Sequence, residues 1–210
     1  MVVAIDGPAG SGKSTIARCV ADRLGYFFVN SGNLYRAVSY YVLSRKSDPA
    51  DTGEIRGALK EIDIDYSPDA LLLNGTALGD ELRTGEVDHW VSRHSAIPEV
   101  RRRVNDIIRR SVEGRNAVVE GRDMTTVVFP DAEYKFYLDA SLETRARRRM
   151  AAGTEGSVEE VMARTEERDR QDREKAVGSL RRDPDSTYLD TSDLTIEDVC
   201  ETVIASIQKN

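Results

Sequence analysis

The chain has 210 residues, of which 40% are hydrophobic, and its formal net charge is −7 at pH 7. This length and apolar content suit one α/β domain, alone or with a small appendage, around a sizeable core. The negative charge argues against extended nucleic-acid binding, and no apolar run approaches the ~18 residues that a membrane span requires. Because no secretory signal precedes the first apolar segment, we expect a cytoplasmic protein with no membrane or nucleic-acid partner.

A short apolar run at residues 2–6 is followed by a glycine-rich turn and then by helical periodicity. The run predicts a buried parallel strand, and apolar residues at helical spacing over 16–24, with Gly25 as a stop, predict a helix. Between them, residues 7–14 fit G-x-x-x-x-G-K-[ST], the phosphate-binding loop. The residues expected to bind the nucleotide are Gly7, Pro8, Ala9, Gly10, Ser11, Gly12, Lys13, Ser14 and Thr15.

Two side chains of this loop carry specific chemistry. Lys13 can reach the β- and γ-phosphates, and the Ser14 hydroxyl can ligate Mg²⁺. Backbone N–H groups of the turn and the helix N-terminus suit phosphate oxygens. The alternative is a glycine-rich turn that matches by chance, which the flanking strand and helix disfavour. The motif therefore predicts a bound nucleoside triphosphate with Mg²⁺.

A second strand at residues 26–29 leads into Asn30 and a helix whose apolar face begins at Ala37. Ser31 could be an N-terminal cap, and Arg36 could be a solvated helix residue. Because ligands of open α/β sheets lie beyond the carboxyl ends of strands, the two could instead hold a second phosphorylated molecule.

The next segment interrupts the alternation of helix and strand. Residues 46–56 are polar and contain chain breakers, which predicts a loop. Residues 62–66 alternate between apolar and polar, residues 67–69 suggest a turn, and Asn74-Gly75 between two short apolar runs predicts a hairpin. We expect a small antiparallel insert over about residues 60–90.

Helices are predicted over residues 87–95 and from Pro98 onward, followed by a buried strand at 117–120. Arg122 and Asp123 come directly after that strand, at the end that faces the phosphate-binding loop. An internal Arg–Asp ion pair is the alternative to a role in ligand binding.

The last third of the chain contains a strand at 134–139, a helix, a charged stretch at 153–183, and a final strand and helix. Asp139 could orient Mg²⁺ through water or could cap the following helix. The charged stretch, with few apolar residues to anchor it, is either an exposed helix or a mobile lid that excludes water during phosphoryl transfer. Cys19 and Cys200 lie far apart in sequence, so we expect two reduced packing cysteines.

Together these motifs resemble the bacterial cytidylate kinases, and the resemblance spans nearly the whole chain. Its most specific parts are residues 5–8, 30–32 with 35–36, 81–84 with 86–87, 121–124 running through 126–131, and 138–141. The resemblance implies transfer of the γ-phosphate of MgATP to CMP or dCMP, with Lys13, Arg122 and Arg168 as catalytic residues. The acceptor is already an anion, so neither His89 nor His94 has to serve as a general base.

The resemblance also implies a set of substrate-binding residues. Arg36 and Arg122 would contact the monophosphate, and Ser92, Arg101 and Asp123 would read the cytosine base. The full set is Ser31, Tyr35, Arg36, Ser92, Arg101, Arg122, Asp123, Arg168, Asp172 and Lys175. Two positions depart from the family pattern, since Asn30 replaces a frequent aspartate and Lys175 replaces a usual arginine.

The implied architecture is an α/β P-loop kinase fold of nucleoside monophosphate kinase type. It has a central parallel five-stranded sheet flanked by helices, a small antiparallel insert and a helical lid. The expected core comprises residues 1–30, 114–152 and 184–210, with a monophosphate-binding region at 31–113 and the lid at 153–183. Nothing in the sequence requires more than a monomer.

Two other functions remain open from the sequence. A kinase for another monophosphate, such as UMP or AMP, would share the fold, although the expected base-reading residues argue against it. A nucleotide-dependent switch would share the phosphate-binding loop, but no Asn-Lys-x-Asp guanine reader is present, and the arginine-rich stretch favours transfer to a second substrate.

Overall fold

The computed structural model describes residues 1–66 and 70–208, so the turn predicted at 67–69 lies outside the described residues. Contacts divide the chain into two compact units. Unit 1 contains residues 1–29 and 114–210, and unit 2 contains residues 30–113.

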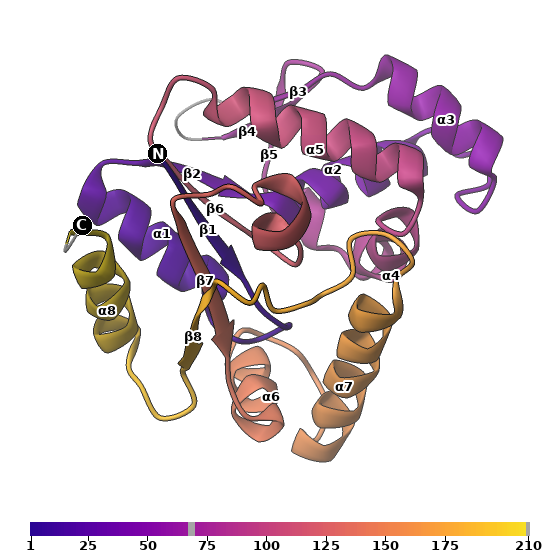
Figure 1. Cartoon of the computed structure of the whole chain (residues 1–210). Helices are drawn as coiled ribbons and strands as arrows, with labels where there is room; N and C mark the ends of the chain where they lie inside the picture. The colour runs from indigo at the N-terminus through magenta and orange to yellow at the C-terminus, as the bar shows by residue number, and fades with distance from the viewer. Residues whose placement is uncertain (67–69, 209–210) are drawn as a thin grey trace. The chain divides into compact units, whose positions relative to one another are not determined.

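Unit 1 is built on a five-stranded sheet with the order β2-β6-β1-β7-β8 (Figure 1). Its strands are β1 (Val2–Asp6), β2 (Phe27–Asn30), β6 (Ala117–Gly121), β7 (Tyr134–Asp139) and β8 (Thr187–Asp190). The central strand β1 pairs in parallel with both β6 and β7. Strand β6 is buried along its whole length, as expected for a strand covered on both faces.

Unit 1 also contains helices that follow its strands along the chain. They are α1 (Lys13–Leu24), α6 (Leu142–Ala151), α7 (Val158–Glu174) and α8 (Ile196–Gln208), with a π-helical turn η2 (Met124–Val128) after β6. Helices α1 and α8 lie side by side (Figure 1) and close a core with the sheet. Fully buried members of this core include Val20, Leu138 and Val203. Burying each such side chain contributes about 1.5–3 kcal/mol relative to exposure.

The expectation of two reduced cysteines is wrong. Cys19 on α1 and Cys200 on α8 form a disulfide, with their Cα atoms 6.3 Å apart. The two positions are separated by 181 residues, and the packing of the first helix of unit 1 against the last one brings them together.

Over its described residues, 30–66 and 70–113, unit 2 combines four helices with a three-stranded antiparallel sheet of order β3-β4-β5. The helices are α2 (Ser31–Ser44), α3 (Thr52–Glu61), α4 (Gly85–His94) and α5 (Pro98–Val112), with a short 3₁₀ turn η1 (Asp80–Arg83). The strands are β3 (Ile64–Tyr66), β4 (Leu71–Leu73) and β5 (Thr76–Leu78). Asn74 and Gly75 connect β4 to β5 with positive φ angles of 49° and 79°, which is the conformation of the predicted hairpin turn.

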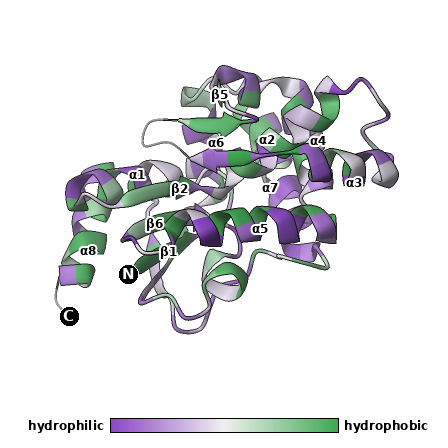
Figure 2. Cartoon of the chain, turned by 90° about the horizontal axis from the view of Figure 1, so that it is seen from above, coloured by the Kyte–Doolittle hydropathy of each residue, from purple (hydrophilic) through white to green (hydrophobic). Residues whose placement is uncertain are grey.

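The predicted loop over residues 46–56 is wrong in its second half, because α3 begins at Thr52. The Asp51 side chain accepts hydrogen bonds from the N–H groups of Gly53 and Glu54, so Asp51 is the N-cap of a helix whose first residues are the apparent breaker Thr52-Gly53. Helix α5 has the predicted amphipathic pattern, visible as alternating green and purple bands in Figure 2. Across the described ranges 1–66 and 70–208, every helix is too short or too polar to span a lipid bilayer.

Candidate active site

The phosphate-binding loop leaves the carboxyl end of β1 and runs directly into α1. Gly12, the residue before the helix, has a φ of 85°, and no side chain caps the helix N-terminus. At Gly10, with a φ of 79°, a Cβ atom would lie 2.9 Å from the carbonyl oxygen of Arg145. The loop thus needs glycine for its path. A glycine-rich loop that leads into a helix N-terminus is a backbone arrangement suited to binding an anion.

Lys13 lies at the start of α1 and is only 6% exposed. Its Nζ donates a hydrogen bond to the Pro8 carbonyl, 3.2 Å away. Burial, assisted by the positive charges of Arg122 and Arg168, lowers the pKa of the Lys13 ammonium to about 7. Bound phosphates would supply the negative charge that this environment lacks.

Next to Lys13, the Ser14 hydroxyl donates a hydrogen bond to Glu120, with an Oγ–Oε1 distance of 2.7 Å. Glu120 is buried near the end of β6, the strand that pairs with β1. Sequence reasoning missed Glu120. The signal that could have identified it is an acidic residue ending an otherwise apolar strand next to the phosphate-binding strand.

The oxygen donors of Ser14 and Glu120 are the ligand type that Mg²⁺ prefers. Within residues 1–66 and 70–208, no cluster of three or more His, Cys, Asp or Glu side chains could hold a metal ion by itself. This donor set fits an ion that takes most of its ligands from substrate phosphates and water, as Mg²⁺ does in kinases.

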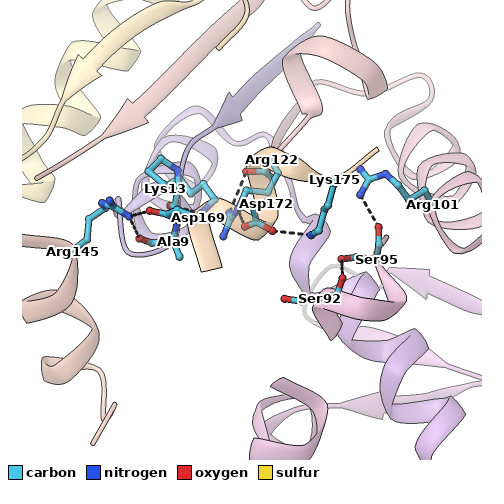
Figure 3. A network of polar contacts seen from close by, with 12 residues as sticks. Ala9, Lys13, Ser92, Ser95, Arg101, Arg122, Arg145, Asp169, Asp172 and Lys175 are labelled. Carbon is cyan, nitrogen blue, oxygen red and sulfur yellow. Dashed lines mark hydrogen bonds and ion pairs between the residues drawn. The ribbon is translucent and has the colours of Figure 1, made fainter. Parts of the chain in front are cut away.

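Asp172 forms the centre of a second group of charges in unit 1 (Figure 3). Its Oδ2 accepts a hydrogen bond from Nε of Arg122 at 2.8 Å, and its Oδ1 accepts one from Nζ of Lys175 at 2.7 Å. Burial opposes ionisation of this carboxyl, but the charges of Arg122 and Lys175 outweigh it and hold the pKa of Asp172 well below its usual range. The structure therefore brings together three predicted site residues from the end of β6 and from α7.

Helix α7, most of the predicted lid, is anchored by polar groups. Asp169 is 1% exposed and forms an ion pair with Arg145 of α6. Both groups also bind the peptide of Ala9, as Figure 3 shows. The Ala9 N–H donates to Asp169 at 3.3 Å, and the Ala9 carbonyl accepts from Arg145 at 3.2 Å. These contacts connect the charged helix directly to the phosphate-binding loop.

Three more residues of unit 1 that the sequence singled out are Arg168, Asp123 and Asp139. Arg168 lies on α7, and its positive charge contributes to the lowered pKa of Lys13. Asp123 is 1% exposed and is the residue that precedes η2. Asp139 does not cap α6, because Ser141 does so. The Asp139 carboxylate instead accepts a hydrogen bond from the Ala140 N–H.

A third group of predicted residues lies within unit 2. The guanidinium of Arg101 on α5 lies over the ring of Tyr35 on α2, with its Cζ 5.3 Å from the ring centroid. Arg101 also donates to the Ser95 carbonyl at 3.1 Å, and the Ser95 hydroxyl donates to the Ser92 carbonyl at 3.0 Å. Figure 3 shows this chain of contacts from α5 to the end of α4. Tyr35, Arg101 and Ser92 are therefore held in one local network.

Ser31 and Arg36 occupy the first two turns of α2. Ser31 is not the N-cap, because Asn30 holds that position and its side chain accepts from the Asn33 N–H at 3.0 Å. Ser31 is buried, and Arg36 forms an ion pair with Asp88 of α4. Asn30, which departs from the family pattern, thus caps the helix.

Both histidines lie on α4 in unit 2. His94 is buried, and its two ring nitrogens contact the Ser39 hydroxyl and the Pro49 carbonyl, each at 2.9 Å. Burial lowers the pKa of His94. His89 makes an edge contact with the ring of Trp90.

A model of the cytidylate kinase family matches residues 3–209. The chain belongs to the cytidylate kinase family. The cytidylate kinase of Thermosipho melanesiensis is 42% identical over 99% of this chain and 96% of its own length. That of Caldanaerobacter subterraneus is 40% identical over 99% and 95%, and that of Clostridium botulinum is 34% identical over 99% and 98%.

Solved structures support the fold. TT1252 from Thermus thermophilus matches with a TM-score of 0.52 at 21% identity, covering 100% of this chain and 96% of that one. A shikimate kinase from Bacteroides thetaiotaomicron matches with a TM-score of 0.50 at 12% identity, covering 100% and 97%. The predicted P-loop kinase fold is confirmed, and the family establishes that the chain is a nucleoside monophosphate kinase.

Proposed function

We propose that this kinase transfers the γ-phosphate of MgATP to CMP or dCMP, giving ADP and CDP or dCDP. One observation carries the proposal. The match to cytidylate kinases extends over residues 3–209, and so includes the segments expected to bind the acceptor as well as the phosphate-binding loop. The loop alone would leave the acceptor open.

On the donor side, residues 7–15 would bind the phosphates of ATP through backbone N–H groups and the N-terminus of α1. Lys13 would contact the β- and γ-phosphates, and its buried position makes it a strong partner for added negative charge. Ser14 would ligate Mg²⁺, and the Glu120 carboxylate, which accepts from the Ser14 hydroxyl, would orient it. The ion would supply neutralisation of the triphosphate charge.

Phosphoryl transfer needs charge neutralisation and positioning more than proton transfer. Lys13, Arg122 and Arg168 would surround the transferred group, and Lys175 would assist from the end of the lid. In this structure Asp172 forms ion pairs with both Arg122 and Lys175. A phosphate that approaches Arg122 therefore competes with a carboxylate for the same cation. Residues 153–183 would act as the lid that keeps water from the γ-phosphate.

On the acceptor side, Ser31, Tyr35 and Arg36 would hold the monophosphate. Ser92, Arg101 and Asp123 would read the base. Cytosine offers an amino donor at N4 and acceptors at N3 and O2, so a carboxylate can accept from N4 while an arginine donates to the acceptors. Uracil has an acceptor at C4 and a proton on N3, which the same groups disfavour. The aromatic contact of Arg101 with Tyr35 supports this assignment, because it restricts where the guanidinium can point.

The test is a coupled ADP-release assay with ATP and Mg²⁺, run against CMP, dCMP, UMP and AMP. The protein variants are the wild type, Asp123→Ala, Asp123→Asn, and the control Asp131→Asn at an exposed position. We expect turnover of CMP and dCMP well above that of UMP and AMP. Both Asp123 variants should lose it by at least about 100-fold, the scale of an unpaired buried group in the substrate complex.

Each outcome separates one part of the proposal. Equal turnover of UMP would leave a kinase but overturn the role of Asp123 in base selection. UMP turnover in place of CMP turnover would establish the alternative acceptor. Turnover of none of the four acceptors would overturn the proposed reaction. A loss of CMP turnover in Asp131→Asn equal to that in the Asp123 variants would show a general effect on the fold.

A further inference from the structure

Asp6 is a fully buried carboxylate that the reaction above does not use. It is the last residue of β1 and lies immediately before the phosphate-binding loop. The sheet register places it beside Gly121 on β6 and Tyr137 on β7, in the middle of the sheet. A buried carboxylate is costly to keep ionised unless its hydrogen bonds are satisfied, so its partners indicate its purpose.

Within the part of the chain that the structure describes, the hydrogen bonds of the Asp6 carboxylate all go to two adjacent residues more than a hundred positions away. Oδ1 accepts from the Met124 N–H at 2.9 Å. Oδ2 accepts from the Thr125 N–H at 2.8 Å and from the Thr125 hydroxyl at 2.7 Å. Met124 and Thr125 are themselves completely buried. These three donors have no access to water, so the carboxylate is what satisfies them.

The residues that Asp6 binds open η2, the π-helical turn that follows Arg122 and Asp123. The first N–H groups of any helical turn have no partner within the turn. In η2 the side chain of the N-cap residue, Asp123, makes no capping hydrogen bond. Asp6 does the capping from β1 instead. The Asp123 carboxylate is therefore not needed to hold its own turn.

We propose that Asp6 is a positioning residue for the acceptor, whose carboxylate holds the start of η2 and thereby fixes Arg122 and Asp123 relative to the phosphate-binding loop. This inference rests on the proposed function, which assigns Arg122 to the transferred phosphate and Asp123 to the base. Each end of this contact lies one residue from a part of the site. Asp6 precedes Gly7 of the loop, and Met124 follows Asp123. A shift of η2 by an ångström would displace both acceptor-binding side chains at once, which can cost about 100-fold in rate.

The surroundings of Asp6 give the proposal a pH signature. Burial raises the pKa of Asp6 to about 6 despite the hydrogen bonds from Thr125 and Met124, and the nearby Asp123 carboxylate adds to the rise. The Tyr137 phenol also faces Asp6, and burial raises the pKa of that phenol to about 12. Protonated Asp6 carries a hydrogen that must itself be donated, so it cannot accept all three hydrogen bonds. Acceptor binding should therefore weaken as pH falls through about 6.

The experiment compares wild type, Asp6→Asn, Thr125→Val and Thr125→Ser. Asparagine keeps the shape but turns one acceptor oxygen into an NH₂ donor that faces a backbone N–H. Valine removes only the hydroxyl donor, and serine retains it. The measurements are kcat and KM for CMP, the Kd of ATP alone by calorimetry, the thermal melting temperature, and kcat/KM for CMP between pH 5 and 8.

For Asp6→Asn we expect kcat/KM for CMP to fall by at least about 100-fold, while the Kd of ATP changes by less than about threefold. Thr125→Val should lose about tenfold in the same parameter, and Thr125→Ser should stay within about twofold of wild type. Wild type should lose activity reversibly below pH 6. Because the substrate phosphates also ionise near pH 6, Asp6→Asn should keep their share of this acid limb but lose one ionisation relative to wild type. A purely structural role would lower ATP binding and CMP turnover together.

Asp6→Asn with CMP turnover within threefold of wild type would overturn the proposal, and so would equal losses in ATP affinity and CMP turnover. If Asp6→Asn fails to fold, the pair Thr125→Val and Thr125→Ser decides, because equal activities in those two variants would contradict the role. A wild type that phosphorylates none of the tested monophosphates overturns the proposed function and this inference with it. An active wild type with an indifferent Asp6→Asn overturns only the inference.

Discussion

Lys13 should take up a proton when a nucleoside triphosphate binds. In the free protein, burial and the nearby charges of Arg122 and Arg168 lower the pKa of Lys13 to about 7. The triphosphate brings negative charge to the ammonium and should return the pKa toward its ordinary value of 10.5. The group is then neutral in a large fraction of free molecules and charged in the complex.

The size of the uptake follows from the pKa. At pH 8 a group with a pKa of about 7 is roughly 10% protonated, so binding should take up about 0.9 proton per site. At pH 7 the uptake should be about 0.5 proton. Affinity for ATP should accordingly fall by up to about tenfold per pH unit above 7. In the same window the unfolded chain holds more protons on Lys13 than the folded protein does. The stability of the free protein should therefore rise with pH between about 7 and 10.5.

The assay is isothermal calorimetry of ATP binding at pH 8 in buffers of different ionisation enthalpy. The slope of the observed enthalpy against the buffer enthalpy gives the number of protons. At pH 8 the terminal phosphate is already almost fully deprotonated and adds little of its own. Lys13→Met should bind ATP weakly with a slope near zero. The control Lys60→Met, at an exposed position of α3, should keep the wild-type slope. A wild-type slope near zero at pH 8 would refute a neutral Lys13.

Two further predictions concern stability. The disulfide of Cys19 and Cys200 closes a loop of about 180 residues, for which chain entropy predicts a contribution to stability of up to about 5 kcal/mol. Reductant should therefore lower the urea midpoint of the wild type but not that of Cys19→Ala. Two titratable thiols in the non-reduced, unfolded wild type would contradict the disulfide. Asp169→Ala should lower the free energy of unfolding in urea by about 3–5 kcal/mol, because it leaves the buried Arg145 without its ion-pair partner. Glu143→Ala breaks an exposed ion pair on α6 and should lower it by less than about 0.5 kcal/mol. Similar losses of stability in the two variants would contradict this prediction.

The sequence was informative wherever apolar periodicity or turn chemistry determined the element. The strands of the central sheet, the helix after the phosphate-binding loop and the Asn74-Gly75 hairpin fall where these patterns predict them. Helix α3 was missed because Thr52-Gly53 resembles a break, although the preceding Asp51 is a cap. Propensity could not decide between a loop and a short helix whose stability comes from burying Ile55 and Ala58.

The contacts that the sequence could not predict are those between charged groups distant along the chain. Asp169 lies in a run of charges that hydropathy reads as solvent-exposed, yet it is one of the most buried residues of α7. Asp6 is the last residue of a buried strand and Glu120 the last but one of another. An acidic residue in such a place identifies a site only once its partner on the neighbouring segment is known. The pairing of Cys19 with Cys200 likewise depends on which helices pack together, a tertiary property that no local pattern encodes.

Two carboxylates hold the segment around Arg122 and Asp123, and they respond to different signals because their partners differ in charge. Asp172 faces two cations, so its pKa stays below its usual range and acid does not release Arg122 in the working range of pH. Only a competing anion can do so, which makes that contact responsive to phosphate. The hydrogen-bond donors that face Asp6 are neutral, so burial is the largest influence on its pKa and raises it to about 6. Acid should therefore impair this kinase through Asp6 while leaving the Asp172 ion pairs intact. The acid limb should be as steep in Asp172→Asn as in wild type but shallower in Asp6→Asn, in which the substrate phosphates still titrate.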